Sequence, residues 1–113
     1  MPRYKLVVLS NPVEGREAEY QDWYQNVHLG QVVAFKGFKS ARRFRLAKNL
    51  VEREALPYLA IYEIETDDLE GVMEEVQKHA GTDRLLVSET LDVEHSFAAI
   101  YEEFGPVVKL LSN

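Results

Sequence analysis

The stretch "NPVEGREAEYQDWYQNVHLGQVVAFKGFKSARRFRLA", residues 11–47, contains a helix signal, a turn and a strand in succession. Tyr20, Trp23, Tyr24 and Val27 recur at the i, i+3, i+4 and i+7 spacing of one helix face. This spacing predicts a helix that runs to about Ala34.

The start of this helix has a capping signal. Asn11 can cap a helix, Pro12 suits the first helical position, and Glu14 can close a capping box. Gly15 weakens that start, so a first turn a few residues later is the alternative. Gly37 is the expected turn residue after the helix.

A strand is predicted at 38–47. Phe38, Phe44 and Leu46 are separated by even steps, as expected for one face of a strand. Arg43 and Arg45 take the other face, which leaves Arg42 on the face of Phe38.

The rest of the chain predicts three more strands and one more helix. The strands are "YKLVVLS" (4–10), "PYLAIYEIE" (57–65) and "SFAAIYEEFGP" (96–106), and the helix is "TDDLEGVMEEVQKHAG" (66–81), with Asp67 and Glu70 as a capping box. Residues 82–95 are expected to form a loop with a short strand. The order predicts one α+β domain over residues 1–113, a ferredoxin-like βαββαβ fold with an antiparallel sheet and both helices on one face.

The predicted strands are apolar on both faces. Tyr58, Ala60 and Tyr62 alternate with Leu59 and Ile61 along 57–65. Since the helices cover one face, a monomer would expose the other as a large apolar patch, which monomers rarely do. Face-to-face pairing of two sheets with two-fold symmetry solves this problem, so the sequence predicts a homodimer. The apolar tail "VVKLLSN" (107–113) is expected to reinforce it.

Composition narrows the class of protein. The chain has 113 residues, a net charge of −6 and no cysteine. The charge argues against nucleic acid as a partner, although "KSARRFRLAK" (39–48) is locally basic. No apolar run approaches the ~20 residues of a membrane helix, and the N-terminal run is too short for a secretory signal. The lack of cysteine fits a reducing cytoplasm.

Sequence motifs for cofactors are missing. His28, His79 and His95 lack metal-ligand spacing, and the chain contains neither a phosphate loop nor a Rossmann glycine pattern. We therefore expect no metal and no cofactor. His28 is of the right type to be a haem ligand, but nothing else in the sequence favours haem.

The order of elements over nearly the whole chain resembles the dimeric α+β barrel superfamily, and most closely its EthD-like proteins. Their pattern is an aromatic pair on the first helix, a histidine, and a Gly-Phe turn that opens the second strand, here Trp23, Tyr24, His28, Gly37 and Phe38, followed by Arg43. The resemblance implies a homodimer whose sheets form a barrel, with a pocket between sheet and helices. The superfamily includes cofactor-free quinol and anthrone monooxygenases, muconolactone isomerases, polyketide cyclases and haem-handling proteins, so the fold does not settle the function.

The candidate catalytic residues are His28 and Tyr24. His28 lies at the border of the helix stripe, one turn after Tyr24, and histidine is the natural general base near neutral pH. Tyr24 or a sheet tyrosine, Tyr62 or Tyr101, is the expected donor to an oxyanion. The alternative for His28 is a half-buried packing residue.

Further pocket-lining candidates are Trp23, Arg42 and Arg43. Trp23 is expected to form a wall, although core packing is the more frequent role of tryptophan. A buried arginine would indicate an anionic substrate group, and the sequence leaves open whether Arg42 or Arg43 reaches the pocket. A surface ion pair is the alternative for both.

Two classes of function follow. The first is a cofactor-independent monooxygenase, isomerase or cyclase that acts on a hydrophobic or aromatic small molecule. The second is a non-catalytic dimer that binds a small molecule or assists a catabolic pathway. An enclosed apolar cavity reached by His28 would support the enzyme, and a filled core would oppose it.

Overall fold

The computed structural model describes residues 1–111 and has the predicted order of elements. The last two residues of the predicted apolar tail lie outside this range. The elements are β1 (Arg3–Ser10), α1 (Glu17–Trp23), the π-helical turn η1 (Tyr24–His28), α2 (Leu29–Val33), β2 (Phe38–Arg45), β3 (Tyr58–Glu65), α3 (Leu69–His79), the 3₁₀ turn η2 (Val93–His95) and β4 (Phe97–Glu102).

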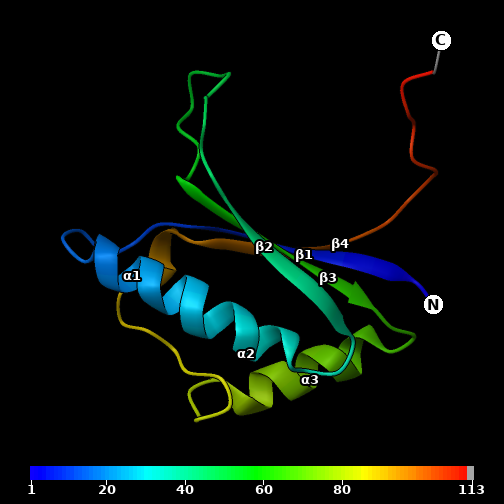
Figure 1. The fold of residues 1–113 in the computed structure, drawn as a ribbon, viewed down its shortest axis with the longest axis horizontal. Coiled ribbons are helices and arrows are strands. Elements are labelled where there is room, and N and C mark those ends of the chain that lie inside the picture. Colours follow the sequence, from blue (N-terminus) through cyan, green and yellow to red (C-terminus); the bar gives the residue numbers. More distant parts are fainter. Residues whose placement is uncertain (112–113) are drawn as a thin grey trace.

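The four strands form one antiparallel sheet in the order β2-β3-β1-β4. All helices lie on the same face of this sheet (Figure 1). The α+β class, the βαββαβ order and the antiparallel sheet predicted from the sequence are therefore confirmed. None of the helices between residues 1 and 111 is both long and apolar enough to cross a bilayer.

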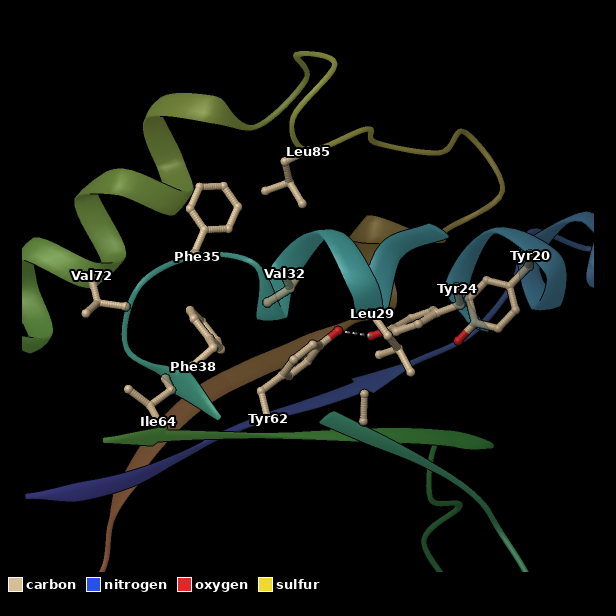
Figure 2. Close-up of a cluster of buried hydrophobic side chains, with 11 residues drawn as sticks. Tyr20, Tyr24, Leu29, Val32, Phe35, Phe38, Tyr62, Ile64, Val72 and Leu85 are labelled. Atoms are coloured by element: carbon tan, nitrogen blue, oxygen red, sulfur yellow. Dashed lines mark hydrogen bonds between the residues drawn. The ribbon is translucent and has the colours of Figure 1, made fainter. Parts of the chain in front are cut away.

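The core lies between the helices and the sheet, as Figure 2 shows. It is unusually rich in aromatic side chains, and its buried members are Tyr20, Tyr24, Leu29, Val32, Phe35, Phe38, Ala60, Tyr62, Ile64, Val72 and Leu85. The sheet contributes Phe38 of β2 and the even-numbered Ala60, Tyr62 and Ile64 of β3, because successive side chains of a strand point to opposite faces.

The first helix begins at Glu17, later than the signal at Asn11 indicates. Pro12 forms an isolated bridge with Leu91, and Gly15 has a φ of 83°, so the backbone turns before the helix can start. The prediction of a capping box at Asn11 is therefore wrong. The alternative, a helix that starts a few residues after Gly15, is confirmed. Within the described chain, no side chain caps this helix.

The second capping box is also displaced. Asp68, not Asp67, is the N-cap of α3, and its carboxylate accepts a 3.0 Å hydrogen bond from the backbone N–H of Gly71. A Cβ atom on Gly71 would lie 2.3 Å from Oδ2 of Asp68, so any larger residue here would require the capping carboxylate to shift.

A bulge in β2 changes which residues face the helices. The pairing of β2 with β3 shifts register between Phe38 and Ser40. Arg43 pairs with the buried Ala60 and faces the helices, whereas Arg42 pairs with Ile61 and faces the other side. The predicted alternation, which placed Arg42 on the face of Phe38, is wrong because the bulge inserts one extra residue.

We call the whole face of the sheet that points away from the helices the open face. One end of this face is apolar. One row across the four strands consists of Phe44, Leu59, Leu9 and Phe97. The opposite end is charged: Lys5 pairs across the strands with Glu63 and forms a 3.0 Å ion pair with it.

Two apolar segments project on the same side as the open face (Figure 1). One is the β2–β3 loop, in which Leu50 is 84% exposed. The other follows β4, which ends at Glu102 and is shorter than predicted. We call residues 103–111 the C-terminal arm. Its large apolar side chains are exposed, namely Phe104, Val107, Val108, Leu110 and Leu111. Residues 82–95 form a loop with isolated bridges and the turn η2.

Candidate functional site

His28 lies in a cluster of aromatic rings. Its ring centre is 4.5 Å from that of Trp23, with the planes 30° apart. The ring of Tyr24 is 5.1 Å away and nearly perpendicular, and that of Tyr62 is 6.4 Å away. Thus the first helix supplies three of these rings and β3 supplies the fourth.

The π-helical turn η1 creates this arrangement. Trp23 and His28 are five residues apart, which in an α-helix would place them about 140° apart around the axis. A π turn forms i→i+5 hydrogen bonds and so brings such a pair onto the same side. In a regular α-helix, His28 would lie at the border of the apolar face. The π turn instead brings it into contact with Trp23.

Burial controls the charge of His28. It lowers the pKa of the imidazole from 6.5 to about 4, so the ring is neutral at pH 7. Its Nδ1 atom is buried and has no hydrogen-bond partner among residues 1–111. Buried polar atoms are nearly always paired, so this one is an exception that calls for an explanation.

The tyrosine hydroxyl groups are linked in pairs. The Tyr62 hydroxyl donates to that of Tyr24 over 3.5 Å, as Figure 2 shows. The Tyr20 hydroxyl lies 2.5 Å from Oγ of the buried Ser10. Burial raises the pKa of Tyr24 and, much more strongly, that of Tyr62. These hydroxyl groups therefore remain protonated and can donate hydrogen bonds.

Arg43 lies on the other flank of Tyr24. Its guanidinium carbon is 4.7 Å from the ring centre of Tyr24 and 5.5 Å from those of Tyr20 and Tyr58. It donates a 2.6 Å hydrogen bond to the side-chain oxygen of Gln21. It also lines an open cleft of about 570 Å³ between α1 and the β2 edge, together with Glu17, Gln21, Phe44, Arg45 and Tyr58.

The structure brings together five of the seven candidate residues: Trp23, Tyr24, His28, Arg43 and Tyr62. It does not bring Arg42 and Tyr101 to them. Tyr101 pairs with Lys5 and, like Arg42, points to the open face. Of the two candidate arginines, Arg43 is thus the one on the helix side.

Sequence reasoning did not assign Gln21, Tyr20 and Tyr58 to the site. Tyr20 was recognised as part of the helix stripe, and Tyr58 shares the alternation of Ala60 and Tyr62. That alternation was a usable signal for Tyr58. Gln21 belongs to the site because the bulge in β2 turns Arg43 towards the helix, where it donates a hydrogen bond to Gln21. The sequence contains no signal for this bulge.

The surroundings of His28 are packed. His28 lines none of three surface clefts within residues 1–111. The second, of about 520 Å³, lies near the start of α3 and includes Asp68 and Arg84. The ring of Tyr24 contacts both Arg43 and His28, so it lies between the open cleft and the histidine.

Within residues 1–111, no three histidine or carboxylate side chains are grouped closely enough to hold a metal ion. His95 forms a 2.7 Å contact with Asp92 alone, and His79 a 3.3 Å contact with Glu75.

Comparison with solved structures identifies the fold. An EthD family protein from Bacillus halodurans superposes with a TM-score of 0.51 at 16% identity, over 92% of this chain and 100% of that one. The chain has the fold of an EthD family protein. A second protein with this EthD-like fold, a candidate monooxygenase from Shewanella loihica, has a TM-score of 0.57 at 13% identity, over 97% and 99% of the two chains.

No family model and no curated protein sequence matches the chain. The resemblance to EthD-like proteins that the sequence predicts is confirmed for the fold, since identities this low concern the fold alone.

Proposed function

We propose that the protein is a cofactor-independent enzyme that removes a proton from a hydrophobic, aromatic or enolisable small molecule, with His28 as the base. One observation carries this proposal: the neutral imidazole of His28 has a buried, unpartnered Nδ1 atom inside a π-helical turn. An unpaired buried polar atom costs roughly 1–3 kcal/mol. π turns occur frequently at functional sites, where such costs are tolerated.

The chemistry follows from the neutral state of the ring. A C–H or O–H bond of the substrate breaks, the proton moves to His28, and the electron pair stays on the substrate as an enolate or phenolate. A pKa of about 4 makes His28 a weak base alone. The anion formed beside it stabilises the imidazolium, because an opposite charge favours the protonated form.

Tyr24 and Tyr62 are the proposed donors to the new oxyanion. Both hydroxyl groups stay protonated, and they already lie within 3.5 Å of each other. Donors fixed in advance stabilise developing charge strongly in a site that excludes water. Reprotonation elsewhere would make the protein an isomerase, ring closure a cyclase, and attack on oxygen a monooxygenase, which is the candidate activity named for the Shewanella loihica protein.

Access to His28 from the cleft beside Arg43 would require a movement of Tyr24. The substrate is proposed to enter through the cleft beside Arg43, since Tyr24 lies between the two residues. Rotation of one tyrosine side chain would connect the cleft with His28. Such rearrangements on substrate binding are common in enzymes.

We also propose that two copies associate through their open faces and complete a barrel. The row Phe44, Leu59, Leu9 and Phe97 and the exposed C-terminal arm support this, because monomers rarely expose apolar patches of this extent. A second copy seated on the open face would also contact the two projecting segments.

A non-catalytic binding protein is the second candidate. The packing around His28 favours it, because the imidazole lines none of these three clefts within residues 1–111. In that case His28 only supports the aromatic cluster.

Deuterium exchange distinguishes the two candidates. A panel of quinols, anthrones and enol-lactones is incubated with the protein in heavy water, and exchange at the acidic position is measured by NMR, with oxygen uptake in parallel. His28→Phe should slow exchange roughly 10²–10⁴-fold. The control His95→Phe, at an exposed position, should not. Binding without exchange for any compound would support the binding protein.

A further inference from the structure

We infer that Arg43 anchors the carboxylate group of an aromatic ligand in the cleft beside β2. This inference rests on the proposed function, because it specifies the class of compound that the same site would take.

Arg43 has no acidic partner. The ion pairs of the described chain involve other cations, and no carboxylate within residues 1–111 lies within 4.0 Å of its guanidinium group. Its hydrogen-bond partner is the neutral side chain of Gln21. A guanidinium group has five N–H donors and a fixed positive charge, so a neutral partner leaves the charge uncompensated.

The surroundings hold the guanidinium group in place. Arg43 pairs across the strands with Ala60, whose small side chain leaves room for the long arginine side chain. The guanidinium carbon lies 4.7–5.5 Å from the ring centres of Tyr20, Tyr24 and Tyr58. Aromatic faces attract a cation and restrict its motion. A fixed guanidinium fork matches the two oxygens of a carboxylate, which favours this planar anion.

The local charge contrasts with that of the whole chain. The protein has a net charge of −6. The cleft is lined by Arg43 and Arg45 against one carboxylate, that of Glu17, which accepts a hydrogen bond from the backbone N–H of Gly15. A locally positive cleft on an acidic protein concentrates anions where other surfaces repel them.

The lining also indicates the body of the ligand. Tyr58 lies on the helix side of the sheet and presents an aromatic side chain at the cleft, next to the charged groups. Its volume of about 570 Å³ is in the range of small-molecule sites. One or two fused rings with a carboxylate fit this combination of charge, shape and size.

Two matched compounds test the inference. Titration calorimetry on the full chain at low salt compares 2-naphthoate with the neutral 2-naphthamide. We expect naphthoate to bind at least about tenfold more tightly, since a hydrogen bond to a charged group contributes more than one between neutral groups. Arg43→Gln should weaken naphthoate binding roughly 10–100-fold and remove the preference over naphthamide.

The adjacent arginine is the control. Arg42 has the same side chain on the same strand but points to the open face, so Arg42→Gln should leave naphthoate binding unchanged. In case Arg43→Gln does not fold, amide NMR shifts in the wild-type chain provide a second measurement. Naphthoate should shift the signals of Glu17, Gln21 and Arg45 more than those of α3.

Several results would overturn the inference: equal affinity for naphthoate and naphthamide, unchanged binding in a folded Arg43→Gln, shifts confined to another face, or no saturable binding of naphthoate. These results are distinguishable from a failure of the proposed function. His28→Phe should still bind naphthoate, since His28 does not line the cleft, whereas it should lose deuterium exchange.

Discussion

The imidazole of His28 stacks on the indole of Trp23 at a centre-to-centre distance of 4.5 Å. The π turn makes this contact, because it places residues five apart on the same side of the helix. The stacking shields part of the imidazole from water, and burial is what lowers its pKa to about 4. The shape of one helical turn thus determines the charge of the candidate base.

The first prediction is acid sensitivity in a defined pH range. The unfolded chain binds a proton on His28 near pH 6.5, whereas the folded chain does so only near pH 4. Acid therefore favours the unfolded state, and stability should fall as the pH drops from 6.5 towards 4. The loss should reach about 2 kcal/mol by pH 5, at 1.36 kcal/mol per pKa unit. Urea unfolding from pH 7 to 5 measures it, and an NMR titration giving an ordinary histidine pKa would contradict it.

The second prediction concerns His28→Phe. Phenylalanine keeps a ring against Trp23 and removes the unpartnered Nδ1 atom. The variant should be as stable as the wild type at pH 7, or more stable by about 1 kcal/mol, and should lose most of the pH dependence below 6.5. Urea unfolding at pH 7 and pH 5 tests both points. A large loss of stability at pH 7 would indicate that Nδ1 has a partner, such as ordered water.

The third prediction is a coupling between Ser10 and Tyr20. Their hydroxyl oxygens lie 2.5 Å apart, and both residues are almost completely buried. Tyr20→Phe leaves the Ser10 hydroxyl unpaired and should cost about 1–2 kcal/mol. Adding Ser10→Ala should recover part of this loss, because both polar groups are then gone. A double-mutant cycle by denaturant unfolding measures the coupling, and strictly additive effects would argue against the bond.

The fourth prediction separates two adjacent aspartates. Asp68→Ala removes the cap of α3 and should lower the free energy of unfolding by about 1 kcal/mol. Asp67→Ala is the matched control and should change it by less than about 0.5 kcal/mol. Thermal or urea unfolding of both variants suffices, and the reverse order would restore the capping box expected from the sequence.

The fifth prediction is the dimer. Sedimentation at micromolar concentration should give about twice the 13.0 kDa chain mass. Leu59→Glu places a charge in the apolar row of the open face and should produce monomers. Gln77→Glu adds the same charge to the exposed surface of α3 and should not. A monomeric wild-type chain would refute the proposed barrel.

The sequence was sufficient for the order of elements and the antiparallel sheet, because alternation and helical spacing are averaged over many residues. It failed where a single residue changes the geometry. The bulge after Phe38 reverses the faces of Arg42 and Arg43, and the π turn rotates His28 relative to Tyr20. Both features are one-residue departures from regular spacing. Tyr101 was misplaced for a different reason: its type suggested the pocket, but its strand register, unknown from sequence, points it to the open face.

The doubled arginine of β2 also bears on how this strand finds its pairing. A slip of β2 by one residue along β3 would exchange Arg42 and Arg43, and each face would still carry a guanidinium group. The charges therefore do not specify the register. Their neighbours do, because a slip in one direction would place the charged Arg42 opposite the buried Tyr62, where the small Ala41 now lies, and a slip in the other direction would place the polar Ser40 there. Ala41, a residue without any chemical function, thus helps to decide which arginine faces the helices.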